Sequence, residues 1–511
     1  MDLTSWISAA ASLIRWLIFR LPLAFSIPFA SISALWIFAG FPLVIRSLIK
    51  PATQGLIAYF ELPEILSDNL RSVFEASVVI LLFSAGPVLA YNLSAFTNWV
   101  LVRSKLRAIP YSDGSPQVPE KIIGLEPDLF SNVEKIGIVL AGGGARAAFQ
   151  AGAMKAIYQL LGEHRALEKV KVISSTSTGS WNALFWLADL IMPQGGWNGR
   201  GVHENWWRSI SVKSLIAPSW YIPFFRNCFL SPEPWRQVFD HLFGREDVRE
   251  RLISTKIHFY MTRSNIGAGE LDCVTNNTAP PSIARVRYEI AHADEPDRFL
   301  DTIKCGVFAS MDMPPLFPYS KIENRLFEDG GVIDNLPITF PALEGCDLIF
   351  ILPLNADFEA DINQRSLVHR FKRVMDVRQG ALERSGFKLV YLYNELAALR
   401  QCLEGAATSR PPEAALDPSS DSFREATPLD RALARRNRHI NVFAVCPNKQ
   451  FVDASIDTYE IWKAEEAGIA FEVMYDSTAR LLRRCSFDAP QNTVRMALIS
   501  RNGSVLWDEN F

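Results

Sequence analysis

The chain has 511 residues, enough for about three domains at roughly 150 residues each. A net charge of −3, from 52 basic and 55 acidic residues, gives no support to a general nucleic-acid binder. With 49% hydrophobic and 21% charged residues, the composition excludes wholesale disorder. The seven scattered cysteines form no C-x-x-C pair, which argues against a disulfide framework or a zinc site and favours a reducing compartment: Cys228, Cys273, Cys305, Cys346, Cys402, Cys446 and Cys485.

Apolar residues concentrate in the first hundred positions. Two uncharged runs, 21–45 and 76–102, stand there, and the first would reach about 37 Å as a helix, enough to cross a bilayer core of about 30 Å with tilt. We therefore expect a membrane-associated helical hairpin within residues 1–103, with two membrane spans at 21–45 and 76–102. The alternatives are a hairpin that lies on one face of the membrane and a hairpin that packs on the soluble domain.

The basic residues around these runs predict an orientation. Positively charged side chains favour the cytoplasmic side of a membrane span. Five basic residues precede the first run or follow the second, and three lie between the two runs: Arg15, Arg20, Arg103, Lys105 and Arg107, against Arg46, Lys50 and Arg71. We expect both ends of the hairpin, and the domain that follows it, on the cytoplasmic side.

A proline-containing linker at 104–131 separates the hairpin from a region in which strand and helix patterns alternate. A helix is expected at 147–164, directly after the first strand. This alternation predicts an α/β domain with a mainly parallel sheet. The expected buried strands are 135–141, 170–175, 257–262, 348–354 and 440–445.

Two insertions interrupt the alternation. Residues 192–236 contain Trp197, Trp206, Trp207, Trp220 and Trp235, which form either a small satellite core or a cap that meets the membrane–water boundary. Residues 404–430 are rich in alanine, proline, serine and aspartate and are expected to be disordered.

The first motif with chemical potential is a glycine loop, Gly142-Gly143-Gly144-Ala145-Arg146, between the first strand and its helix. Such a loop exposes N–H groups that stabilise negative charge. It fits an oxyanion hole, a phosphate cradle or a purely structural turn. A dinucleotide site would need an acidic residue at the end of the next strand, and that strand ends in serines and threonine at 174–177.

The second motif, Ser175-Thr176-Ser177-Thr178-Gly179, follows the next strand and precedes a helical stretch at 180–190. A serine on a tight strand-to-helix turn projects its hydroxyl out of the sheet, as in G-x-S-x-G elbows. The third motif, Asp329-Gly330-Gly331, places a carboxylate in a loop that could act as the base for a serine. Alone, each of these two motifs is also an ordinary turn.

In this order, the three motifs resemble the patatin-like phospholipase family, whose members hydrolyse lipid acyl esters with a serine–aspartate dyad. The resemblance covers about residues 135–355 and is strengthened by the block ASMDMPPLFPY at 309–319. It implies a three-layer α/β catalytic domain at 132–400, with 431–511 as a C-terminal α/β extension.

Carried over by motif, the resemblance makes Ser177 the nucleophile and Asp329 the base. The oxyanion donors would come from Gly142, Gly143, Gly144 and the Arg146 region, and the motif neighbours are Ser175, Gly179, Gly330 and Gly331. Two positions depart from the family pattern. Ser175 replaces the first elbow glycine, and Ala147 replaces the glycine after Arg146; both substitutes are small.

A dyad is expected rather than a triad. Only His369 and His439 follow the acid in the chain order of an α/β-hydrolase triad, and neither has a glycine-flanked loop setting. The expected function is membrane-anchored hydrolysis of phospholipids or lysophospholipids through an acyl-serine intermediate, without a metal or organic cofactor and without a nucleic-acid partner. The rivals are a catalytically inactive lipid-binding scaffold of the same fold and a soluble dinucleotide enzyme.

Overall fold

The computed structural model describes residues 129–193, 199–209, 217–218, 228, 230–313, 316–354, 367–407, 439–456, 464–485, 487 and 494–508. The expected hairpin runs at 21–45 and 76–102, nearly all of the linker at 104–131 and residues 408–430 lie outside this part. Among the helices that the structure describes, none is both long and apolar enough to cross a bilayer.

The described residues fall into two compact units. The smaller contains 217–218, 228, 230–238 and 316–318. In it, β3 (Ala217–Pro218) pairs antiparallel with β4 (Leu230–Ser231), and the Leu230 N–H donates to the Leu316 carbonyl over 2.8 Å. The larger unit contains the other described residues, including the glycine loop, the turn around Ser177 and the Asp329 loop.

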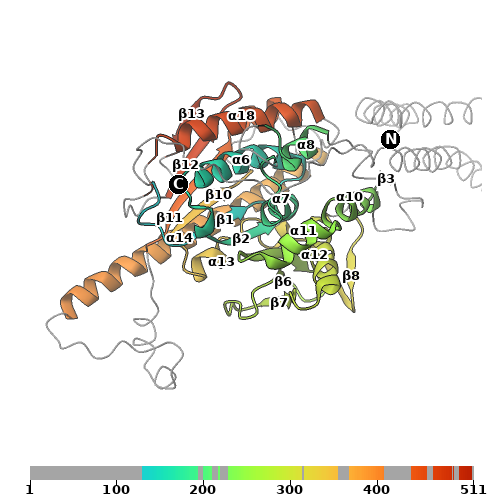
Figure 1. Cartoon of the computed structure of the whole chain (residues 1–511), viewed down its shortest axis with the longest axis horizontal. Coiled ribbons are helices and arrows are strands. Elements are labelled where there is room, and N and C mark those ends of the chain that lie inside the picture. The colour runs from blue at the N-terminus through green and yellow to red at the C-terminus, as the bar shows by residue number, and fades with distance from the viewer. Residues whose placement is uncertain are drawn as a thin grey trace, which may run out of the picture. The chain divides into compact units, whose positions relative to one another are not determined.

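An 11-stranded mixed sheet forms the centre of the larger unit (Figure 1). Its main path runs β13-β12-β11-β10-β1-β2-β5-β6-β7, and β9 pairs with β5 and β8. The six strands from β12 to β5 are parallel to one another. The bounds are β1 Ile136–Leu140, β2 Val170–Thr176, β5 His258–Asn265, β6 Glu270–Thr275, β7 Val286–Ile290, β8 Ser320–Ile322, β9 Arg325–Asp329, β10 Leu348–Leu352, β11 Asn441–Pro447, β12 Val494–Ile499 and β13 Val505–Asp508.

Helices cover both faces of this sheet, which makes three layers (Figure 1). One face carries α13 and α14; the other carries α6, α7 and α12, with α18 packed against α6 and α8. The bounds are α6 Ala147–Glu163, α7 Thr178–Leu187, α8 Val202–Ser209, α10 Glu233–Phe243, α11 Glu246–Ser254, α12 Pro296–Met311, α13 Thr339–Leu343, α14 Leu367–Ala407, α17 Lys449–Ala454 and α18 Ala464–Leu482, with short 3-10 turns η4 Gly144–Arg146, η5 Leu167–Lys169 and η6 Gly330–Val332.

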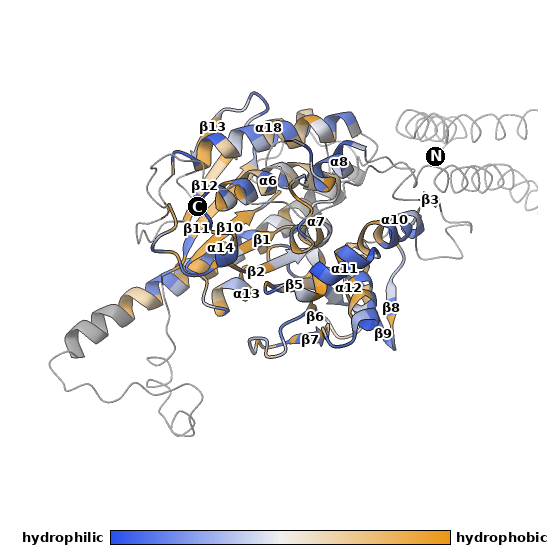
Figure 2. Cartoon of the chain, viewed as in Figure 1, coloured by the Kyte–Doolittle hydropathy of each residue, from blue (hydrophilic) through white to orange (hydrophobic). Residues whose placement is uncertain are grey.

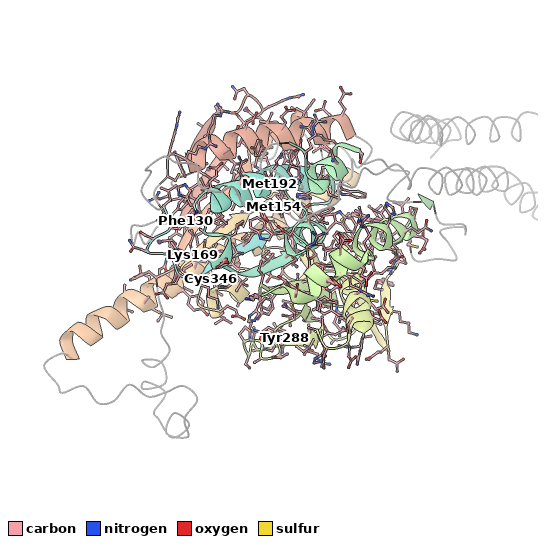
Figure 3. All side chains as sticks on the ribbon, in the orientation of Figure 1. Phe130, Met154, Lys169, Met192, Tyr288 and Cys346 are labelled. Atoms are coloured by element: carbon pink, nitrogen blue, oxygen red, sulfur yellow. The ribbon has the colours of Figure 1, made fainter. Side chains whose placement is uncertain are left out.

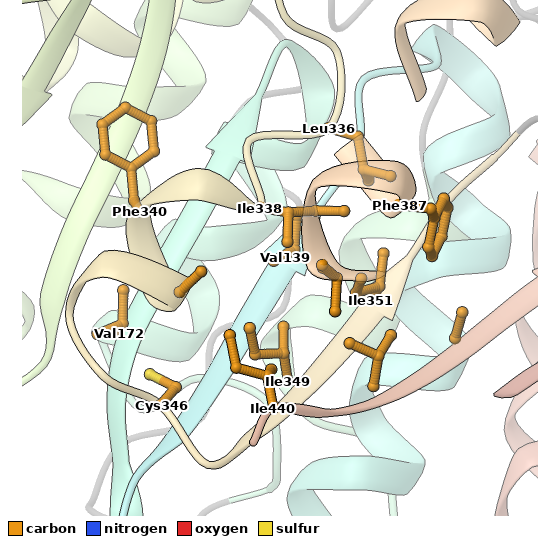
Figure 4. Packing of buried hydrophobic residues seen from close by; sticks show 14 of the residues in the cluster. Val139, Val172, Leu336, Ile338, Phe340, Cys346, Ile349, Ile351, Phe387 and Ile440 are labelled. Carbon is orange, nitrogen blue, oxygen red and sulfur yellow. The ribbon is translucent and has the colours of Figure 1, made fainter. Parts of the chain in front are cut away.

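The central strands are apolar on both sides because both faces are covered. Every residue of β1 and β10 is buried. Figure 2 shows the hydrophobic colour along the central strands. Alternate residues of these strands, such as Val139 and Ile351, pack under α13 and α14 against Ile338 and Phe387 (Figure 4). On the opposite side the α6 layer is filled by buried side chains such as Met154 (Figure 3). The expected three-layer α/β fold with a mainly parallel sheet is confirmed.

Candidate active site

Ser177 stands between the end of β2 and the start of α7 in a strained backbone conformation, with φ 53° and ψ −131°. Non-glycine residues adopt positive φ only where the surrounding structure enforces it. The turn is tight: a Cβ on Gly179 would lie 2.4 Å from the Leu140 carbonyl oxygen, so glycine is required where α7 approaches the end of β1. Such a turn is typical of a nucleophile elbow.

The two departures from the family pattern fit without distortion. Ser175 is an extended residue of β2 outside the positive-φ region, and its hydroxyl donates to the Tyr260 carbonyl over 3.4 Å. Ala147 begins α6 with φ −61°. Neither backbone position needs the freedom of glycine, so serine and alanine preserve the local geometry.

Asp329 ends β9 and caps η6, and its carboxylate faces the serine. Its Oδ2 accepts the Ser177 hydroxyl over 2.6 Å, and its Oδ1 accepts the Gly331 N–H over 2.8 Å. Both Ser177 and Asp329 are only 7% exposed. Burial raises the pKa of the Asp329 carboxyl to about 6, while the two hydrogen bonds oppose that rise and the nearby Glu328 charge adds to it. A carboxyl with this pKa is a stronger base than an ordinary aspartate.

Strand β5 brings the serine and the aspartate together. Its consecutive residues Thr262 and Arg263 pair with Thr176 of β2 and Asp329 of β9, respectively. Strands β2 and β9 therefore approach each other end to end along β5, and Ser177 and Asp329 meet at the junction. A Cβ on Gly330 would lie 2.4 Å from the Thr262 carbonyl oxygen, which explains why glycine follows the aspartate.

The glycine loop lies directly against the nucleophile. A Cβ on Gly142 would lie 2.7 Å from the Ser177 Cβ, and Gly144 adopts a φ of +57°. The N–H groups of Gly143 and Gly144 donate to no other residue in the described part of the chain. The Arg146 N–H, in contrast, donates to the Gly143 carbonyl over 3.1 Å. Of the N–H groups at this loop, those of Gly142, Gly143 and Gly144 are therefore available to an oxyanion, and that of Arg146 is not.

Two further side chains hold the site, and neither is in the motif set. Asn335 Nδ2 donates to the Gly142 carbonyl over 3.2 Å and to Glu383 of α14 over 2.6 Å, so it joins the glycine loop to the segment after Asp329. Ser310, at the end of α12, accepts the Ser177 N–H over 2.7 Å. The sequence places Ser310 in the ASMDMPPLFPY block and Asn335 six residues after Asp329, but their contacts depend on tertiary structure.

In the described part of the chain, no histidine forms a hydrogen bond with Ser177 or Asp329. His439 precedes β11, at the edge of the sheet where the parallel strands begin, whereas Ser177 follows the opposite end of β2. The seven residues of β2 span about 23 Å at 3.3 Å per residue. His203 is buried against Asn182, at 2.9 Å from its side-chain oxygen. The side chain of His369 lies outside the described residues.

The aromatic insertion contributes buried side chains rather than a cap at Trp206 and Trp207. Both are 1% exposed on α8. The Trp206 ring packs on Trp181 of α7 at 5.3 Å between ring centroids, and the Trp207 indole N–H donates to the Asn182 side-chain oxygen over 2.9 Å. For these two residues the satellite-core interpretation is confirmed and the interfacial one is wrong. Trp197 and Trp220 lie outside the described residues.

Comparison with known proteins points to the family that the motifs resemble. The patatin-like phospholipase family model matches residues 138–342, which include the glycine loop, Ser177 and Asp329. Among solved structures, VipD from Legionella pneumophila aligns with 75% of this chain and 73% of its own at 12% identity, but with a TM-score of 0.27, too low to support an argument. The comparison with curated proteins gives no match. The match confirms the resemblance that the three motifs predicted: residues 138–342 are similar to the patatin-like phospholipase family.

Proposed function

We propose that this protein is a serine acyl hydrolase that cleaves ester bonds of phospholipids or lysophospholipids, with Ser177 as nucleophile and Asp329 as its base. The observation that carries the proposal is the 2.6 Å contact between Ser177 Oγ and Asp329 Oδ2 beside the N–H groups of Gly143 and Gly144. The substrate class is supported by the similarity of residues 138–342 to the patatin-like phospholipase family.

The reaction begins when Ser177 Oγ attacks the ester carbonyl and passes its proton to Asp329 Oδ2. The negative charge that develops on the carbonyl oxygen is stabilised by the Gly143 and Gly144 N–H groups. A carboxylate is a weak base for a serine, so most of the rate acceleration has to come from these preorganised donors. Collapse of the tetrahedral intermediate expels the alcohol, which takes the proton from Asp329. Water then repeats the sequence on the acyl-serine and releases the fatty acid.

The same proposal places the reaction at a membrane. Its support is the pair of uncharged runs at 21–45 and 76–102, and the basic residues outside them favour a catalytic domain on the cytoplasmic side. In this arrangement the domain draws its substrate from the bilayer to which it is tethered.

The function is tested with the full chain and its Ser177→Ala variant on vesicles of phosphatidylcholine and, separately, on lysophosphatidylcholine. Release of free fatty acid from either substrate by the parent, and loss of that release in the variant, is the expected result. Vesicle binding without Ser177-dependent release would contradict the enzyme and favour a lipid-binding scaffold of the same fold.

A further inference from the structure

We propose that the C-terminal end of α12 sets the geometry of the serine–aspartate pair, and that Ser310 is a positioning residue for Ser177. This inference rests on the proposed function. Ser310 is 133 residues from Ser177 in the sequence, is fully buried, and its Oγ accepts the Ser177 N–H over 2.7 Å. Because Ser310 bonds to the backbone of the nucleophile and not to its hydroxyl, it acts through Ser177 and not on substrate.

The hydrogen bond restrains the residue whose backbone is strained. With φ at 53°, Ser177 lies in a region that serine rarely adopts, and such conformations persist only when several contacts enforce them. Two hydrogen bonds restrain the backbone of Ser177. Its carbonyl accepts the Ser180 N–H over 2.8 Å, and its N–H donates to Ser310 Oγ. The Ser310 and Ser180 hydroxyls lie 3.2 Å apart, which leaves Ser310 a partner for its own proton.

Asp312, two residues after Ser310, forms a hydrogen bond with the backbone of the base, Asp329. The Asp312 carbonyl accepts the Asp329 N–H over 3.1 Å. Asp312 is itself anchored, because its carboxylate accepts the hydroxyl of Ser320. Residues 310–312 thus bond to the backbone N–H of the nucleophile and of the base. Strand β5 aligns the ends of β2 and β9, and residues 310–312 fix the two residues that stand at those ends.

This arrangement predicts a loss of turnover without a loss of substrate affinity. Without the Ser310 hydroxyl, the Ser177 N–H is buried without a partner, and the elbow can relax away from Asp329. A displacement of about 1 Å at a reacting group can lower the rate about a hundredfold. We expect Ser310→Ala to lower kcat at least about tenfold, with KM for a soluble short-chain ester within about twofold of the parent, because Ser310 does not reach substrate.

The matched control is Ser174→Ala. Ser174 is also fully buried, stands on β2 three residues before Ser177, and donates one hydrogen bond of 2.7 Å to the Pro337 carbonyl. The Ser174→Ala variant loses a buried hydroxyl on the opposite, α13 side of the sheet without touching the Ser177–Asp329 pair. A merely structural contribution of Ser310 would lower the melting temperature of both variants and leave kcat of both near the parent value well below that temperature.

If Ser310→Ala fails to fold, a second pair of variants separates the effect of side-chain shape from the effect of the hydrogen bond. Ser310→Thr and Ser310→Val have nearly the same shape, but only threonine keeps the hydroxyl. We expect threonine to retain kcat at least about tenfold higher than valine, with equal KM. Equal kcat in the two variants would overturn the inference, as would Ser310→Ala activity within about twofold of the parent.

The experiment also distinguishes failure of the inference from failure of the proposed function. If the parent shows no Ser177-dependent esterase activity, the proposed function fails, and amide hydrogen exchange of the segment containing Ser177 then tests the positioning role alone. Exchange there should be faster in Ser310→Ala than in the parent and unchanged in Ser174→Ala. Unchanged exchange in Ser310→Ala would overturn the role of Ser310.

Discussion

Ser177 donates its hydroxyl to Asp329 over 2.6 Å although 152 residues separate the two in the sequence. The contact exists because Thr176 and Asp329 pair with consecutive residues of β5, so that one strand positions both. The geometry of the pair is therefore set by the sheet and by the end of α12, and the carboxylate reaches the serine without an intervening histidine.

The pH dependence of the reaction should follow the Asp329 carboxyl. The base must be ionised to accept the serine proton, and burial raises its pKa to about 6. On a soluble ester, kcat/KM should rise with an apparent pKa near 6 and be about tenfold lower at pH 5 than on the plateau. Because the Glu328 charge raises this pKa, Glu328→Gln should move the rise to lower pH. A rate that stays constant between pH 4.5 and 8 would exclude Asp329 as the base.

The same carboxyl should make the protein less stable at high pH. Its folded pKa of about 6 lies above the unfolded value of about 3.9, so its contribution to stability is complete below pH 4 and is lost as the pH rises through 6. At pH 8 the buried charge costs up to about 3 kcal/mol. Asp329→Asn should therefore raise the free energy of unfolding at pH 8 and change it little at pH 4.5. Urea unfolding at both values checks this; an equal change at the two would contradict it.

Gly142→Ala should impair catalysis more than folding. The added Cβ would lie 2.7 Å from the Ser177 Cβ and 2.6 Å from Asn335 Oδ1, so the loop has to move away from the nucleophile. Misplaced oxyanion donors typically cost about a hundredfold or more in kcat. The control is Gly267→Ala, where the new Cβ meets only Asn265 Oδ1 at 3.7 Å. Esterase rates of the two variants, with melting curves, decide the outcome; comparable rates would contradict the loop's role.

Trp206→Ala and Trp207→Ala should lower stability and should not affect membrane substrate selectively. Removing a fully buried aromatic side chain costs about 3–5 kcal/mol, and Trp207→Ala also leaves the Asn182 oxygen without one of its donors. Activity on vesicle-borne phospholipid and on a soluble short-chain ester should fall in parallel. A loss confined to vesicles would indicate that the tryptophans meet the bilayer, contrary to their burial.

The sequence was most informative where strands are buried on both faces. The expected strand at 135–141 and helix at 147–164 match β1 and α6 to within a residue, since both have continuous or strongly periodic apolar patterns. Strands β6, β7, β8, β9, β12 and β13 of the sheet were not predicted. β7 and β9 lie at the margin of the sheet, contain charged residues such as Glu289 and Arg325, and do not show the apolar runs of central strands.

The three motifs identified Ser177, Asp329 and the glycine loop because each is a local turn with its own composition. Ser310 and Asn335 could not be assigned roles in the same way. Their importance comes from hydrogen bonds to Ser177 and Gly142, residues 133 and 193 positions away. A buried serine or asparagine in a sequence does not reveal its partner, and only the assembled sheet brings these groups together.

Labelling with a fluorophosphonate tests most directly whether Ser177 is a nucleophile activated by Asp329. The probe should form one covalent adduct with the parent chain, and mass spectrometry of its peptides should locate it on Ser177. Ser177→Ala should not be labelled, and Asp329→Asn should be labelled at least about a hundredfold more slowly while keeping its fold. Labelling of the Asp329→Asn variant at the parent rate, or an adduct on another residue, would contradict this account.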